Sequence, residues 1–152
     1  PPVGPIADAL AAMKDAKAAP LLAAHLLDPH ITDDDVKRAA GALAAIGTDK
    51  ELPQLKQFFA MYRGTAPTDE VAVAVGSVAE AMLRIDPKGS RPLVEAASKD
   101  SMTHPVARAR FEALLTAAPD KGGAAKPAGD KPAPEKGAPE KPADKAATPK
   151  SN

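Results

Sequence analysis

The chain has 152 residues, with twenty basic and twenty acidic side chains, so its formal net charge is zero. Neutrality excludes the uniform attraction to phosphate that nucleic-acid-binding proteins show, and the absence of cysteine excludes disulfides, thiolate nucleophiles and cysteine zinc sites. Seventeen prolines and only three phenylalanines and one tyrosine are unusual for a chain of this length that folds throughout.

Seven helices are predicted from the first 118 positions. The first two are short and rich in alanine, and in the third Val36, Leu43 and Ile46 share one face. The fifth carries the longest apolar stripe, from Val71 to Ile85 in steps of three and four residues, which is longer than a typical strand. In chain order the predicted ranges are 5–14, 18–28, 33–46, 50–62, 69–85, 90–98 and 104–117.

Capping side chains and prolines mark the helix starts. Thr48 and Glu51 have the spacing of a capping box, and Thr32 precedes three aspartates that compensate the dipole of the third helix. Pro92 is placed in the first turn of the sixth helix, where its missing N–H costs little. Thr103 is expected to cap the seventh.

Part of this pattern repeats along the chain. Pro20, Pro53 and Pro92 each stand at the beginning of a helical segment, at offsets of about 33 and 39 residues, which are typical of helical repeats. Pairs of apolar residues upstream of these prolines keep the same offsets: Leu10 and Met13, Leu43 and Ile46, and Met82 and Ile85. Each unit is therefore interpreted as two helices.

The second unit resembles a known family. The segment Arg38-Ala-Ala-Gly-Ala-Leu-Ala-Ala-Ile-Gly47, followed by Leu52-Pro-Gln-Leu55, is similar to the bacterial HEAT-repeat pattern, including its short form named after phycobilisome lyases. Residues 106–114 resemble the first half of another such repeat. The resemblance spans about residues 3–118 and implies an all-α, right-handed solenoid of about 3.5 antiparallel helix pairs, whose second helices line a concave, protein-binding face. It implies no catalytic residue.

The last 34 residues differ in composition. From Pro119 onwards the chain holds no Val, Ile, Leu, Met or aromatic residue, and a degenerate Lys-Pro-Ala-acid unit recurs. Such a segment buries too little apolar surface to offset the entropy of ordering it. The sequence therefore predicts a HEAT-like domain over 1–118 and a disordered low-complexity tail over 119–152.

The first helix lacks an obvious polar outer face. Ile6, Leu10 and Met13 stand among alanines, whereas the end of a solenoid needs a polar cap. We therefore expect further repeats or another domain to precede Pro1 in the full protein.

Two constellations suggest chemistry but have simpler interpretations. His25 and His30 stand near four aspartates, yet a spacing of five with a helix break between them excludes the i,i+4 pair of a helical metal site. Asp100, Ser101 and His104 have the residue types of a hydrolase triad, but they share one predicted turn without a nucleophile elbow. No metal, cofactor or catalytic residue is predicted, and the protein is not expected to be an enzyme.

The second helices carry the predicted partner-binding residues. Phe58 and Met61 are offset from the apolar stripe of their helix, so they either anchor a partner or pack on the adjacent repeat. The full set is His25, Lys56, Gln57, Phe58, Met61 and Lys99.

A non-catalytic protein-binding or scaffolding function follows, with a protein as partner, no nucleic acid and no membrane span. The alternatives are an accessory or regulatory subunit of an enzyme, and a cell-envelope structural protein whose tail acts as a spacer. The tail composition favours the bacterial periplasm or envelope as the compartment.

Overall fold

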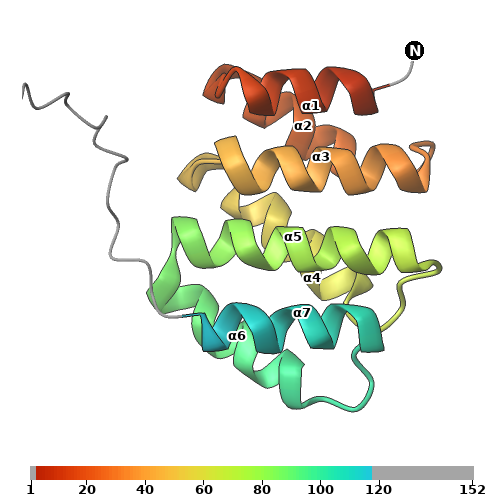
Figure 1. The fold of residues 1–152 in the computed structure, drawn as a ribbon, viewed down its shortest axis with the longest axis vertical. Coiled ribbons are helices and arrows are strands. Elements are labelled where there is room, and N and C mark those ends of the chain that lie inside the picture. The colour runs from red at the N-terminus through yellow and green to blue at the C-terminus, as the bar shows by residue number, and fades with distance from the viewer. Residues whose placement is uncertain (1–2, 118–152) are drawn as a thin grey trace, which may run out of the picture. The chain divides into compact units, whose positions relative to one another are not determined.

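The computed structural model describes residues 3–117, and residues 1–2 and 118–152, including the predicted tail, lie outside this part (Figure 1). Within the described residues every regular element is helical, which confirms the all-α prediction. The helices are α1 (Gly4–Ala12), α2 (Ala19–Leu26), α3 (Asp33–Ile46), α4 (Leu52–Tyr62), α5 (Asp69–Ile85), α6 (Pro87–Lys99) and α7 (Pro105–Thr116). Short 3-10 turns, η1 (Ala16–Ala18) and η2 (Asp49–Glu51), lead into α2 and α4.

The helices of this part form a row and a second layer. The odd-numbered helices α1, α3, α5 and α7 lie side by side in chain order, and each packs on the next (Figure 1). The even-numbered helices form the second layer, in which α2 contacts α3, α4 contacts α5, and α6 contacts both α5 and α7. We call these the odd-numbered row and the even-numbered layer.

Fully buried alanines are frequent on the helices of the odd-numbered row. Ala7 of α1, Ala39 and Ala40 of α3, and Ala72 and Ala79 of α5 are all inaccessible to solvent. Because a methyl side chain loses no rotamer freedom and lets helix axes approach closely, such contacts pack well without large residues. This explains how a chain with so few aromatic residues builds a core.

The aromatic residues concentrate in one region. Phe58, Phe59 and Tyr62 all belong to α4, and the ring of Phe59 lies 5.3 Å from that of Phe111 in α7, in a tilted pair. Such pairs contribute about 0.5–1.5 kcal/mol beyond the area they bury. The α4 helix thus carries three of the chain's four aromatic residues.

The start of α6 differs from the prediction. The helix begins at Pro87 rather than residue 90, because the Asp86 side chain accepts a hydrogen bond from the backbone N–H of Gly89 at 2.9 Å. Aspartate is a favoured N-cap residue and proline is a favoured first helical residue, so Asp86-Pro87 starts the helix before Ser90. Pro92 therefore lies inside the helix, so its predicted place in the first turn was wrong.

The cap of α7 was also assigned to the wrong residue. His104, not Thr103, is the N-cap, and its Nδ1 accepts a hydrogen bond from the backbone N–H of Val106 at 3.3 Å. Thr103 is instead buried, and its hydroxyl accepts from Arg63 at 3.4 Å. The predicted caps at Thr32 and Thr48 are confirmed, the latter with the complete capping box to Glu51.

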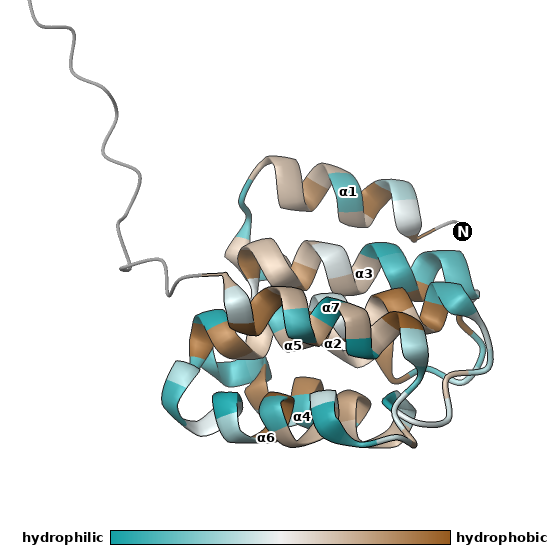
Figure 2. Cartoon of the chain, turned by 60° about the horizontal axis from the view of Figure 1, so that its bottom comes forward, coloured by the Kyte–Doolittle hydropathy of each residue, from teal (hydrophilic) through white to brown (hydrophobic). Residues whose placement is uncertain are grey.

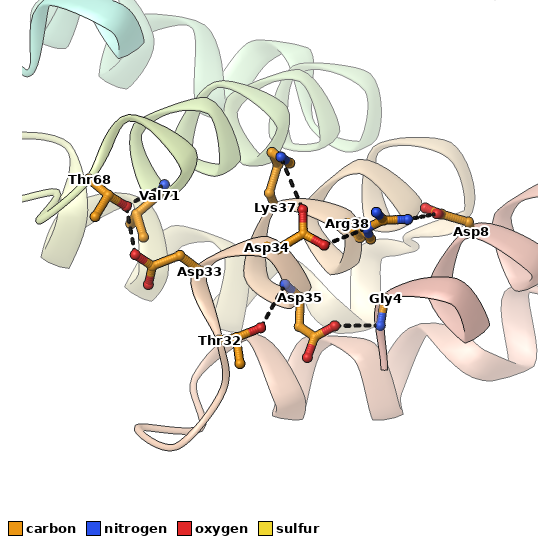
Figure 3. A network of polar contacts seen from close by, with 10 residues as sticks. All are labelled: Gly4, Asp8, Thr32, Asp33, Asp34, Asp35, Lys37, Arg38, Thr68 and Val71. Atoms are coloured by element: carbon orange, nitrogen blue, oxygen red, sulfur yellow. Dashed lines mark hydrogen bonds and ion pairs between the residues drawn. The ribbon is translucent and has the colours of Figure 1, made fainter. Parts of the chain in front are cut away.

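Each of the three aspartates that open α3 has a different partner (Figure 3). Asp33 accepts a hydrogen bond from the Thr68 hydroxyl, which caps α5, at 2.8 Å. Asp34 pairs within its own helix, with Lys37 and Arg38, and Asp35 accepts from the backbone N–H of Gly4 in α1 at 2.6 Å. The run compensates the helix dipole as predicted and also joins the N-termini of α1, α3 and α5.

The first pair of helices exposes large apolar side chains. Ile6 in α1, Met13 just after it and Leu21 in α2 are 55%, 67% and 70% exposed. This matches the predicted lack of a polar face on α1, while the expectation that other repeats precede it remains a prediction. Across residues 3–117 no helix combines the length and the apolar character needed to cross a bilayer.

Candidate partner-binding surface

The predicted binding residues lie on the even-numbered layer. His25 belongs to α2, Lys56, Gln57, Phe58 and Met61 to α4, and Lys99 to α6. The side chains of His25 and Lys56 are half-buried, and those of Gln57, Met61 and Lys99 are exposed. Five of the six are therefore accessible to a partner.

Phe58 is the exception, because only 1% of it is exposed. Its ring lies 4.8 Å from that of Tyr62, one turn away on the same helix. α4 contacts both α2 and α5, so its buried arc is wide enough to include Phe58 beside Leu55 and Phe59. Of the two interpretations given above, internal packing holds for Phe58, and its assignment to the binding surface was wrong. Met61 is half exposed, at 49%.

A shallow groove of about 220 Å³ separates α4 from α6. An ion pair of 3.4 Å between Lys56 and Asp86 bridges the start of α6 to α4, and one of 2.7 Å between Arg63 and Asp100 bridges its end. The groove is lined by Lys56, Phe59, Ala60, Arg63, Leu93, Ala96, Ala97 and Asp100. The groove is mainly apolar, and an ion pair lies at each end. Its lining includes one of the predicted binding residues, Lys56.

Exposed apolar side chains occur on each even-numbered helix. Leu21 of α2, Met61 of α4 and Leu93 of α6 are all about half exposed or more. The sequence interpretation missed Leu21 and Leu93, although both directly follow the repeated prolines that defined the units. Figure 2 shows by hydropathy how apolar and polar segments alternate along the helices. Ile6, Val73 and Met102 are also exposed, so exposure alone does not distinguish this layer from the rest of the described surface.

The residue types of a hydrolase triad serve structural contacts instead. Asp100 accepts hydrogen bonds from Arg63 and from the backbone N–H of Met102, and the Nδ1 of His104 accepts from the backbone of α7. His25 lies 3.8 Å from Asp28, beyond hydrogen-bond distance. In the part of the chain that the structure describes, no group of three or more histidine, aspartate or glutamate side chains is placed to hold a metal ion.

The ion pair of Arg63 and Asp100 makes the free energy of unfolding depend on pH. The hydrogen bond from Arg63, with a further one from the Met102 backbone, lowers the pKa of Asp100 below its usual value near 4. A lowered folded-state pKa contributes stability above the unfolded pKa, and this contribution is lost as the pH falls through the folded one. We expect Asp100→Asn to lower stability at pH 7 and to make its decline below about pH 4 shallower.

Urea unfolding at pH 7 and at several values below pH 4 measures this effect. Asp49→Asn, which removes an exposed carboxylate outside the groove, is the matched control. Parallel pH profiles for Asp100→Asn and the unsubstituted chain would contradict a folded-state role of this pair.

Comparison of the chain with protein-family models, with curated proteins and with solved structures finds no match.

Proposed function

We propose that the protein is a non-catalytic protein-binding module built as a HEAT-like, right-handed solenoid of about 3.5 antiparallel helix pairs, and that it binds its partner on the even-numbered layer. The alternation of row and layer along the chain supports this proposal. So do Pro20 and Pro53, which both stand in the first turn of a second helix. Small residues within the row suit the nearest-neighbour packing of a repeat array.

The groove between α4 and α6 carries the functional part of the proposal. Leu93 is 45% exposed and lines the groove together with Phe59 and the small side chains of Ala60 and Ala96. An apolar side chain of a partner that enters this trough would bury Leu93 and displace poorly bound water. The charge pairs at the two ends provide a polar rim, which is the usual anatomy of a protein interface.

A single charge in the groove tests the proposal. We expect Leu93→Glu to weaken partner binding about tenfold or more, because it places a carboxylate where apolar contact is needed. Val73→Glu is the matched control, since Val73 is 43% exposed but belongs to α5 in the odd-numbered row. Both substitutions lie at exposed positions and should leave the thermal midpoint nearly unchanged.

The measurement is affinity capture from a cell extract with the full chain and both variants, followed by titration of each captured protein. Partners that bind the unsubstituted chain and Val73→Glu but not Leu93→Glu are expected. Equal recovery by both variants would contradict a binding role of the α4–α6 groove.

A further inference from the structure

A second cavity lies away from the α4–α6 groove, at the edge of the fold where α3 and α5 begin. It has a volume of about 200 Å³, smaller than the roughly 300–1,000 Å³ of pockets for drug-sized ligands. It is therefore large enough for one side chain rather than a cofactor. Its lining consists of Leu26, Asp28, Pro29, Ile31, Asp33, Val36, Phe58, Tyr62, Pro67 and Val71.

The lining combines apolar side chains with two carboxylates. The ring centroids of Phe58 and Tyr62 lie 4.8 Å apart in a tilted pair, Phe58 is fully buried, and Tyr62 is half-buried. Asp28 and Asp33 are the only charged residues of the lining, and no lysine or arginine belongs to it. Each carboxylate uses one oxygen within the protein: Asp28 accepts from the His30 backbone at 2.9 Å, and Asp33 accepts from Thr68.

The chain segments around this cavity are acidic. They contain Asp28, Asp33, Asp34, Asp35, Asp69 and Glu70, of which Asp34 is paired with Lys37 and Arg38, and Asp69 lies 3.7 Å from His104. Helices α2 and α4 end beside the cavity, at Leu26 and Tyr62, while α3 and α5 begin there, so the negative and positive helix ends offset one another. The two lining carboxylates, with no lysine or arginine in the lining, therefore set the charge of the cavity.

We propose that this cavity receives the side chain of an arginine or lysine from a protein partner. The aliphatic stem would lie against Tyr62 and the flanking prolines Pro29 and Pro67, and the cationic tip would approach Asp28 and Asp33. A stem that packs on apolar surface while its charge meets carboxylates is the ordinary way in which such side chains are bound. Charge complementarity selects this occupant, because an apolar or anionic side chain would leave the two carboxylates without a counter-charge.

Asp33, Asp34 and Asp35 lie in the first turn of α3, and Asp69 and Glu70 lie in that of α5, so all five compensate a helix dipole, and only Asp33 among them also lines the cavity. Asp28 is different, because it lies after the end of α2, outside every helix. A test must therefore separate the two lining carboxylates from the rest of the acidic edge.

The probes are short peptides titrated into the full chain and followed by backbone amide chemical shifts. Acetyl-Gly-Arg-Gly-amide and acetyl-Gly-Lys-Gly-amide carry the cation, and acetyl-Gly-citrulline-Gly-amide is a neutral control of nearly the same shape. We expect saturable shifts that are largest at the lining residues 28, 31, 33, 36, 62 and 71 with the two cationic peptides, no saturation with citrulline, and weaker binding as salt is raised.

Two double variants complete the experiment. Asp28→Asn with Asp33→Asn should weaken binding of the cationic peptides at least fivefold, because asparagine keeps an acceptor oxygen but removes the charge. Asp69→Asn with Glu70→Gln removes the same charge from the same edge without touching the lining, and should weaken binding less than twofold. Amide spectra away from the cavity verify that both variants are folded.

Equal loss with both double variants would show diffuse attraction to an acidic edge and overturn the proposal. So would equal binding of the citrulline peptide, or shifts spread evenly over Asp34, Asp35, Asp69 and Glu70.

Discussion

Replacement of Phe58 by alanine should lower the free energy of unfolding by about 3–5 kcal/mol, the usual cost of deleting a buried aromatic ring. Phe58 is 1% exposed and contacts Tyr62, so the deletion leaves a cavity between α4 and its neighbours. Since domains of this size are stable by about 5–15 kcal/mol, the loss would be a large part of the total. Urea unfolding followed by circular dichroism measures it.

Met61→Ala is the matched comparison, three residues further along the same helix. Met61 is 49% exposed, so its truncation should cost less than about 1 kcal/mol. Phe58→Leu, which keeps most of the volume, should lose less than Phe58→Ala and remains measurable if the alanine variant does not fold. A larger loss at Met61 than at Phe58 would contradict the burial pattern of α4.

Replacement of Arg84 by methionine should cost about 1–2 kcal/mol, because its guanidinium caps a neighbouring helix. From α5 it donates to the carbonyl oxygens of Ala44 at 2.8 Å and Gly47 at 2.7 Å, at the C-terminus of α3. The last carbonyls of a helix lack partners within the helix, and a cation there also meets the negative end of its dipole. Methionine keeps the apolar stem and removes every donor.

Arg84→Lys separates charge from geometry. Lysine keeps the charge but lacks the planar fork that reaches two carbonyls at once, so an intermediate loss is expected. Lys37→Met removes a cation that pairs only within α3 and should cost about 0.5 kcal/mol or less. Equal stability of Arg84→Met and Lys37→Met in urea unfolding would show that the inter-helix cap contributes nothing.

Much of the helical layout could be predicted, because its signals are local. The spacing of Val71 to Ile85 and the capping pair Thr48 and Glu51 depend on neighbours within one or two turns. α3 and α5 accordingly have their predicted bounds, 33–46 and 69–85. The predicted start of α6 was wrong because two local start signals lie close together, and the helix begins at Asp86-Pro87 rather than at Ser90.

The candidate sites were less predictable, since they depend on pairs of helices. Lys56 was named from its place on a second helix, but the opposite wall of its groove, with Leu93, comes from a helix more than 30 residues away. The cavity beside Tyr62 likewise combines residues from α2, α3, α4 and α5 with those of two loops. No spacing within one segment indicates such a juxtaposition.

By itself, the sequence determined that residues 3–117 form helices, roughly where each helix begins, and which residues cap several of them, because periodicity and capping act over a few residues. Only the tertiary structure decided that Phe58 is buried and Met61 is exposed, although they are less than one turn apart on α4. It also decided which face of α6 remains exposed to solvent. Burial at such positions depends on how many neighbouring helices approach and from which direction. That number is set by the packing of α4 against both α2 and α5.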